Sequence, residues 1–228
     1  MQRAHAEFRT FTDTQGRPLT AEVFQYEPVE QIVSIRLEDG RTFDLPLSRF
    51  SEEDRKYIKN WAKNPGWVIT DETDLAIEVK MSRKRGTKGS GTDFDDRTQS
   101  IQPSISIDNR EIYKSFEGAK AVLVVLGEDM SNAKRWKVLS REEFTFSVPK
   151  RSATSFKGKM LVNEYDDSGS LQYGFKYDGY VFYILNKDNV IVHVKASYGI
   201  WERNTHRFSK LAKDMYVDRK LNEILLEY

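Results

Sequence analysis

The sequence predicts a mainly β fold in two modules, and three observations lead to that class. Hydrophobic residues make up 39% and aromatic residues 12% of the 228 residues, which favours packed strands over a disordered chain. Apolar and polar residues alternate along many short segments, as side chains do in half-buried strands. Turn-forming residues separate these segments without long helical patterns between them, so antiparallel sheets are expected.

The first module is expected to begin with four strands, over residues 7–12, 20–26, 31–37 and 41–47. Between the last two, Asp39-Gly40 predicts a two-residue type I′ turn, because both residues tolerate a positive φ. Ser51 can then cap a short closing helix with the apolar stripe Tyr57, Ile58 and Trp61.

The end of the first module is marked by Asn64-Pro65-Gly66, which stops the helix. The polar stretch that follows is expected to be a linker. The predicted organisation is therefore a module over residues 7–66, a linker over residues 67–74 and a second module over residues 75–228.

Within the second module, the alternating segments, Met160 and Val162 among them, predict about seven strands. The continuous apolar run from Ala121 to Leu126 predicts a central strand, and residues 83–99 a polar loop. The strand number and turn spacing resemble an antiparallel sandwich of the immunoglobulin or fibronectin type III class. Near the end, apolar residues at i, i+3, i+4 and i+7 predict an amphipathic helix packed on the sandwich: Phe208, Leu211, Ala212 and Met215.

Several short segments of the first module occur together and in order: Arg9-Thr10-Phe11-Thr12-Asp13, Ala21-Glu22-Val23-Phe24, Leu37-Glu38-Asp39-Gly40-Arg41, Leu45-Pro46-Leu47 and Phe50-Ser51-Glu52-Glu53-Asp54-Arg55-Lys56-Tyr57. Over residues 7–62 this combination resembles the Sla homology domain one family. The resemblance implies a small SH3-like barrel that binds peptides, as such a domain of a yeast endocytic adaptor receives Asn-Pro-Phe-x-Asp sorting peptides. Residues 75–228 resemble the β-rich partner region of uncharacterised, often exported bacterial proteins.

A peptide-binding face of the first module would need exposed aromatic side chains and a basic reader of an acidic ligand. Phe11, Tyr26 and Phe43 are the candidate aromatic residues, and Arg36 and Arg41 the candidate basic residues. A structural role is the alternative for each, and Phe11 is also one of the expected core residues of the barrel: Phe11, Phe24, Leu37, Leu45 and Leu47.

Composition narrows the possible partners and compartments. With 36 basic and 35 acidic residues the net charge is +1, so no global field attracts nucleic acid or an anionic membrane. The absence of cysteine excludes disulfides, thiol catalysis and cysteine-ligated metals. No apolar stretch is long enough to span a bilayer. Ala4 and Ala6 match a signal-peptidase site without its apolar region, so export to the periplasm or outside the cell and a cytoplasmic location both stay open.

No catalytic, metal-ligating or cofactor-binding set can be assembled from the sequence. The histidines His5, His193 and His206 are scattered and lack metal-spaced partners. Two acidic stretches, Asp93 to Asp96 and Glu164 to Asp167, could supply paired carboxylates, and Asp93, Asp95 and Asp96 could form a calcium site, but solvated loops explain both stretches as well. The basic run Lys80, Arg83, Lys84, Arg85 and Lys88 could contact phosphates, but acidic residues follow it and favour a mixed-charge loop.

The expected function is therefore that of a non-enzymatic protein or peptide binder without cofactor, whose oligomeric state the sequence does not give. The alternative is an exported carbohydrate-binding or carbohydrate-active protein, because its acidic loops are accompanied by four tryptophans that could stack on sugars: Trp61, Trp67, Trp136 and Trp201.

Overall fold

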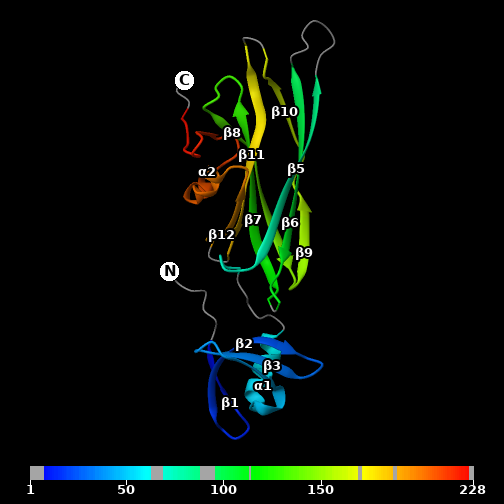
Figure 1. The fold of residues 1–228 in the computed structure, drawn as a ribbon, viewed down its shortest axis with the longest axis vertical. Helices are drawn as coiled ribbons and strands as arrows, with labels where there is room; N and C mark the ends of the chain where they lie inside the picture. Colours follow the sequence, from blue (N-terminus) through cyan, green and yellow to red (C-terminus); the bar gives the residue numbers. More distant parts are fainter. Residues whose placement is uncertain are drawn as a thin grey trace. The chain divides into compact units, whose positions relative to one another are not determined.

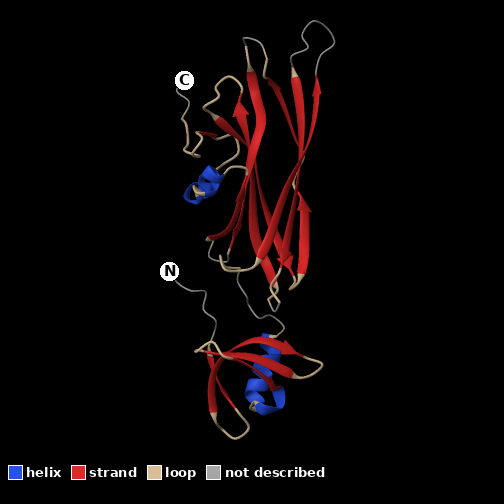
Figure 2. Ribbon diagram, in the orientation of Figure 1, coloured by secondary structure: helices blue, strands red, loops and turns tan. Residues whose placement is uncertain are grey.

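The computed structural model describes residues 8–62, 69–87, 96–112, 114–168, 171–186 and 189–225. The predicted signal-like residues, His5, Trp67 and the acidic residues Asp93 and Asp95 lie outside these ranges. Within them the mainly β fold class is confirmed, since strands in antiparallel pairs dominate and helices are few and short (Figure 2). Among the described residues, no helix is long and apolar enough to cross a membrane.

The chain divides into two compact units. The first consists of residues 1–68 with Glu111–Phe116, and the second of Ile69–Arg110 with Glu117–Tyr228. The predicted linker over residues 67–74 stays a prediction. Its described part forms a hydrogen-bonded turn, in which the Thr73 hydroxyl accepts a bond from the Thr70 backbone N–H at 2.9 Å.

The first unit is an antiparallel meander followed by a short helix (Figure 1). The strands pair in sequence order, and the elements are β1 (Arg9–Thr12), β2 (Pro18–Glu27), β3 (Ile32–Leu37), β4 (Thr42–Pro46), the 3-10 turn η1 (Leu47–Arg49) and α1 (Glu52–Trp61). An isolated bridge between Asp13 and Phe50 extends the pairing. The described pairing leaves β1 and β4 at the two ends of the sheet, so a closed SH3-like barrel stays a prediction.

The predicted hairpin between β3 and β4 is present, but its turn differs from the expected type. Only Gly40 has a positive φ, of 86°, and the Leu37 backbone N–H donates to the Arg41 carbonyl at 2.9 Å. The loop therefore holds three residues and ends in a left-handed glycine. Asp39 is outside the left-handed region, and its carboxylate accepts the Arg41 backbone N–H at 3.0 Å.

Asp54 connects the sheet of the first unit to its helix. Its buried carboxylate accepts hydrogen bonds from the Thr12 backbone N–H at 2.7 Å, the Ser51 hydroxyl at 2.9 Å and the Arg9 guanidinium at 3.2 Å. The Ser51 oxygen also accepts the Asp54 backbone N–H, so the predicted N-cap is confirmed. One side chain thus satisfies groups from β1 and from the start of α1.

We expect Asp54→Ala to destabilise the first unit by about 3–5 kcal/mol, because it leaves buried donors without their acceptor. Hydrogen exchange at the amides of β1 and α1 in the full chain measures the loss. Asp39→Ala, at an exposed ion pair with Arg41, is the control and should change little. Equal exchange rates in the two variants would contradict the role given to Asp54.

The described residues of the second unit form nine strands, all paired antiparallel in a β-sandwich-like arrangement (Figure 1). They are β5 (Leu75–Thr87), β6 (Arg97–Asn109), β7 (Phe116–Asp129), β8 (Trp136–Val148), β9 (Ser152–Lys157), β10 (Leu161–Asp166), β11 (Tyr173–Leu185), β12 (Ile191–Ala196) and β13 (Tyr216–Val217). The strand order is β13-β8-β7-β11-β10-β6-β5, with β12 on β11 and β9 on β6. The finer immunoglobulin or fibronectin class stays a prediction.

The predicted central strand is confirmed as β7, which lies between β8 and β11. Every residue from Ala121 to Leu126 is buried, so both faces of the strand are covered. Val122, Val124 and Leu126 pack in a cluster with Trp201 and Phe208 of the C-terminal segment. This continuous apolar run reflects a strand without a solvent face.

Two sequence expectations for the second unit are wrong in detail. Residues 83–99 are not one loop, because β5 continues to Thr87 and β6 begins at Arg97; residues 88–95 lie outside the description. The predicted helix over residues 208–215 is replaced by two short helical segments, α2 (Gly199–Glu202) and η2 (Thr205–Lys210). Phe208 and Leu211 are buried as predicted, but the chain then turns, with φ of 70° at Asp214, to pair β13 with β8.

His193 lies on β12 and is half-buried. Burial lowers the pKa of His193 below its usual value of 6.5, while a hydrogen bond with the Thr70 backbone opposes the shift. The unfolded chain therefore takes up this proton more readily than the folded chain does.

As the pH falls below about 6.5, we expect the protein to lose free energy of unfolding through His193, until the folded-state pKa is passed. Denaturant unfolding between pH 5 and pH 8 measures the slope, which His193→Gln should reduce. His206→Gln, at an exposed position, is the matched control. An unchanged slope in His193→Gln would contradict this assignment.

Candidate binding groove between strands β8 and β10

The five ligand-binding candidates in the first unit do not form one site. Phe11 is only 1% exposed and packs against Phe50 and Tyr57, with ring centroids 5.7 and 5.9 Å apart. Its proposed role as an exposed aromatic is therefore wrong, because its strand faces α1 across the core of the unit. The alternative reading of Phe11 as a core residue is confirmed.

The remaining four candidates are distributed over both faces of the sheet. Tyr26 and Phe43 lie opposite the buried residues Val33 and Ile35 in the strand register, and so point to the same side as the core. Arg36 is one residue further along β3 and points to the other side, where its guanidinium lies over the Phe24 ring at 5.3 Å. Arg41 is in the hairpin turn, paired with Asp39.

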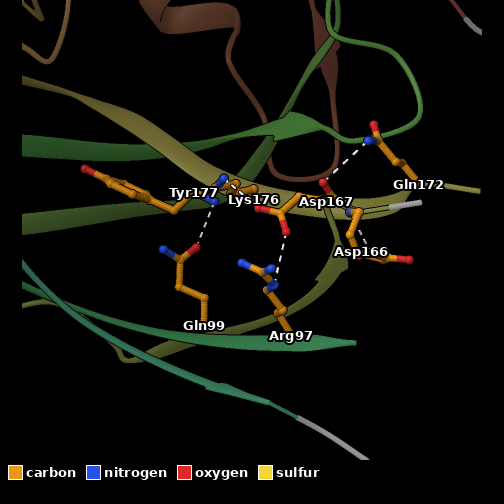
Figure 3. A network of polar contacts seen from close by, with 8 residues as sticks. Arg97, Gln99, Asp166, Asp167, Gln172, Lys176 and Tyr177 are labelled. Carbon is orange, nitrogen blue, oxygen red and sulfur yellow. Dashed lines mark hydrogen bonds and ion pairs between the residues drawn. The ribbon is translucent and has the colours of Figure 1, made fainter. Parts of the chain in front are cut away.

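The acidic stretch Glu164 to Asp167 is engaged in structural contacts. The Asp167 carboxylate forms ion pairs with Lys176 at 2.8 Å and Arg97 at 3.1 Å, and the Lys176 ammonium lowers its pKa (Figure 3). The Asp166 carboxylate accepts the Ser168 backbone N–H at 2.8 Å, which is turn geometry. Both carboxylates therefore hold the end of β10 in place.

A groove of about 480 Å³ lies on the second unit between β8 and β10. Its lining combines apolar, charged and amide or hydroxyl side chains: Lys137, Leu139, Ser140, Arg141, Glu142, Lys159, Leu161, Val162, Asn163, Glu164, Phe175, Lys213 and Asp214. Apart from Glu164, which belongs to one of the candidate acidic stretches, none of these residues was predicted as a site residue, because the segments they come from meet only in the folded chain.

Consecutive residues of both strands line the groove, from 139 to 142 on β8 and from 161 to 164 on β10. Successive side chains of a strand point to opposite faces, so a groove lined by all of them runs along the strand edge. The pairing agrees with this. On the edge of β8 away from β7, the described partner β13 covers only residues 136–138. In the described pairing, Leu161, Val162 and Asn163 of β10 pair with β6 alone.

Two polar atoms in the groove lining are buried and have no hydrogen-bond partner in the described chain, the Ser140 Oγ and the Asn163 Nδ2. Asn163 lies opposite Gln99 of β6 in the register, and the Gln99 Nε2 is also buried without a partner. Buried polar groups in folded proteins normally have a partner, so the Ser140 hydroxyl and the Asn163 amide keep unused hydrogen-bonding capacity in the residues that line the groove, whereas Gln99 is fully buried and does not line it.

The walls of the groove are fixed by contacts to the C-terminal segment. The Arg141 guanidinium donates to the Phe208 and Leu211 carbonyls at 3.3 and 3.2 Å and to the Tyr183 hydroxyl at 3.0 Å. The Lys137 ammonium forms an ion pair with Asp214 at 2.9 Å. These contacts hold the segment beside β8, where β13 stops after two residues.

Exposed apolar residues mark the β10 side of the groove. The alternation of Met160 and Val162 predicted a strand, and β10 is present there but begins at Leu161, after Met160. Met160 and Val162 are 62% and 60% exposed. Leu161 and Tyr165 instead take the inward side. Val162 therefore lies in the lining of the groove as an exposed residue, whereas Met160 does not line it.

A second polar cluster lies elsewhere on the second unit. The Asp178 carboxylate accepts hydrogen bonds from the Trp136 indole N–H at 2.8 Å and from the Tyr198 hydroxyl at 2.7 Å. The bond to Asp178 raises the pKa of Tyr198 to about 12. Burial, and then the charge of Asp178, raises the pKa of Glu128. Two carboxyl groups thus share a surface region with two aromatic rings.

Comparison with protein-family models and with curated proteins found no match for the chain. Solved structures give weak likenesses. A crystal structure from Akkermansia muciniphila has 9% identity, covers 56% of this chain and 72% of that chain, and has a TM-score of 0.31. The X-ray structure of a Northeast Structural Genomics Consortium target has 12% identity, covers 54% of this chain and 84% of that chain, and has a TM-score of 0.28.

A third likeness, to red sea bream transglutaminase, has 11% identity, covers 75% of this chain and 28% of that chain, and has a TM-score of 0.23. All three TM-scores are too low to carry an argument about the function of this chain. The groove therefore has to be interpreted from its own residues.

Proposed function

We propose that the protein is a non-enzymatic interaction protein whose second unit binds an extended polypeptide segment in the groove between β8 and β10. The observation that carries the proposal is the lining of this groove by the edges of two strands. An extended segment can add to such an edge as a further strand, with main-chain hydrogen bonds giving affinity and side-chain contacts giving specificity.

The chemistry of the lining supports a polypeptide ligand. Leu139, Leu161 and Phe175 offer apolar surface to alternate side chains of a bound strand. The Ser140 hydroxyl and the Asn163 amide are buried without a partner in the described chain, and a change of side-chain rotamer would let them pair with a ligand's peptide groups. The resemblance of residues 7–62 to the Sla homology domain one family favours the same class of function for the first unit.

We expect octapeptides selected from a random library on the full chain to shift the amide NMR signals of residues 139–142 and 161–163 and to slow their hydrogen exchange. Val162→Asp should weaken binding about tenfold, because it places an unpaired carboxylate against the bound strand. Binding is measured by titration calorimetry.

Met160→Asp is the matched control for this substitution. Met160 is 62% exposed against 60% for Val162, lies two residues away and does not line the groove. The affinity of the Met160→Asp variant for the peptide should therefore stay within about twofold of the wild type. If both variants bind like the wild type, or if the shifts fall on other strands, the proposed site is wrong.

Carbohydrate binding is the second candidate, and the cluster of Asp178, Glu128, Trp136 and Tyr198 is the observation that favours it. Sugar rings stack on aromatic side chains, while their hydroxyl groups pair with carboxylates. The exposed Tyr198 ring is next to the Trp201 ring, at 4.8 Å between centroids.

If the cluster binds sugars, the full chain should recognise a glycan on an array, and Tyr198→Ala should weaken that binding about tenfold through the loss of the stacking ring. Tyr173→Ala is a close control, because Tyr173 has similar exposure, 44% against 41%, and its hydroxyl also donates to an aspartate, Asp96. The absence of any glycan signal would eliminate this second candidate.

A further inference from the structure

Strand β5 lies at one end of the sheet of the second unit, and its outer edge is unpaired in the described chain. Its 13 residues pair with β6 in one unbroken register. The carbonyl of Asp74, just before β5, accepts the Arg110 backbone N–H at 3.0 Å. Because the backbone groups of successive residues point to opposite sides of a strand, the even-numbered residues direct theirs toward β6. The odd-numbered residues direct theirs to the open edge.

The outward backbone groups in the middle of β5 are available for pairing. The Leu75 N–H is engaged in the preceding turn, where it donates to the Thr73 carbonyl at 2.9 Å. Further along, the outward groups of residues 77, 79 and 81 have no backbone partner within the described chain. The side chains of these three residues lie opposite buried residues of β6 but are themselves only half-buried. A long, regular edge of this kind is a template for a further strand.

The charges of β5 and of the turn before it are separated by sign, and all of them are exposed. The acidic residues come first along the chain: Asp71, Glu72, Asp74 and Glu78. The basic residues follow: Lys80, Arg83, Lys84 and Arg85. On β6, the residues opposite 83–85 are uncharged, so the neighbouring strand does not offset the positive charge there. The edge is therefore negative in its first half and positive in its second half.

A second copy of the chain has the complementary edge when the two β5 strands are aligned antiparallel about Val79. In this alignment, Glu78 lies opposite Lys80 of the second copy, and Asp74 lies opposite Lys84. Odd-numbered residues then meet odd-numbered residues. The outward backbone groups of the two copies therefore face each other and can form a hydrogen-bonded ladder.

Other alignments bring like charges together. A parallel pairing in register places each charge opposite its own copy, and an antiparallel pairing centred on Ser82 places Lys80 opposite Lys84. Charged residues on an edge strand normally oppose pairing with other strands, and here they disfavour these alignments. Within one copy, the Lys80 ammonium lies 3.0 Å from the Glu78 carboxylate. Antiparallel pairing about Val79 joins two such ion pairs into one network of alternating charges.

We propose that β5 is a homodimerisation edge, to which a second copy of this chain adds antiparallel about Val79, with Glu78 and Lys80 setting the alignment. The two-fold axis passes through Val79, so both copies use the same surface and the contact closes at two chains. A second copy fits because it reproduces both halves of the charge pattern in the reverse direction. The groove between β8 and β10 lies on other strands, and the inference is independent of the proposed function.

Sedimentation velocity of the full chain at about 100 µM should show a species of twice the chain mass. Reversing the charge at either central position, by Glu78→Lys or Lys80→Glu, should weaken the dimer about tenfold or more, because four like charges then meet at the axis. The control is Lys134→Glu, which reverses a charge at an exposed turn outside β5 and should dimerise like the wild type.

A mixture of the two reversal variants tests the alignment itself. In a mixed pair, the ammonium groups of the Glu78→Lys chain lie opposite the carboxylates of the Lys80→Glu chain. The equimolar mixture should therefore regain the dimer to within about threefold of the wild-type affinity, which a misfolded variant could not do.

Hydrogen exchange locates the contact in the wild type. The amides of residues 77, 79 and 81 should exchange more slowly as the protein concentration rises, because they become bonded only in the dimer. The amides of residues 78 and 80 already face β6, so their exchange should change little.

A chain that stays monomeric at about 100 µM overturns the inference. A dimer that persists in both reversal variants also overturns it, because another surface then forms the contact. A mixture that stays monomeric does the same, because Glu78 and Lys80 of the two copies then do not face each other. Peptide binding at the groove is measured separately, so its failure is distinguishable from each of these results.

Discussion

Strands β7 and β11 are apolar on both faces, and the second unit is arranged so that both faces are covered. Residues 121–126 of β7 and 181–184 of β11 are buried, and the cluster on one face includes Trp201, Phe208 and Leu211. A parallel-sheet protein would cover such strands with helices. Here an irregular C-terminal segment with two short helical turns covers one face of these strands. Because this segment is not one continuous helix, side-chain contacts have to hold it in place.

Those anchors explain why a groove exists. Arg141 of β8 satisfies two carbonyls of the segment, and β13 pairs with β8 at only two residues before the chain turns away. The segment thus covers the core face but leaves the edge of β8 beyond Val138 open. On the other side of the groove, β9 and β10 pair with successive parts of β6. The backbone N–H of Lys159, which lies between β9 and β10, donates to the Glu142 carboxylate of β8. An open edge in such a sheet invites a further strand.

Polar groups in the second unit differ in how completely they are satisfied. Around Asp167, the carboxylate faces Arg97 and Lys176, and the Gln99 side-chain oxygen accepts the Tyr177 backbone N–H at 3.0 Å (Figure 3). Ser140 on β8 and Asn163 on β10, by contrast, each have a buried polar atom without a hydrogen-bond partner in the described chain. Gln99 belongs to both groups, because its Nε2 is also buried without a partner in the described chain, so the contact network around Asp167 and the incompletely satisfied groups adjoin one another.

Local signals in the sequence determined the elements that depend on neighbouring residues. The apolar run at 121–126 predicted β7, Ser51 predicted the cap of α1, and alternation predicted most strands, because periodicity and capping act within a few residues. Tertiary packing decided three other features. These are the exposure of Met160 and Val162, the burial of Phe11 and the end of the helical segment at Lys210. The groove belongs to the same group, because Ser140, Asn163 and Lys213 come together only when strands distant in the sequence pair and leave two edges open.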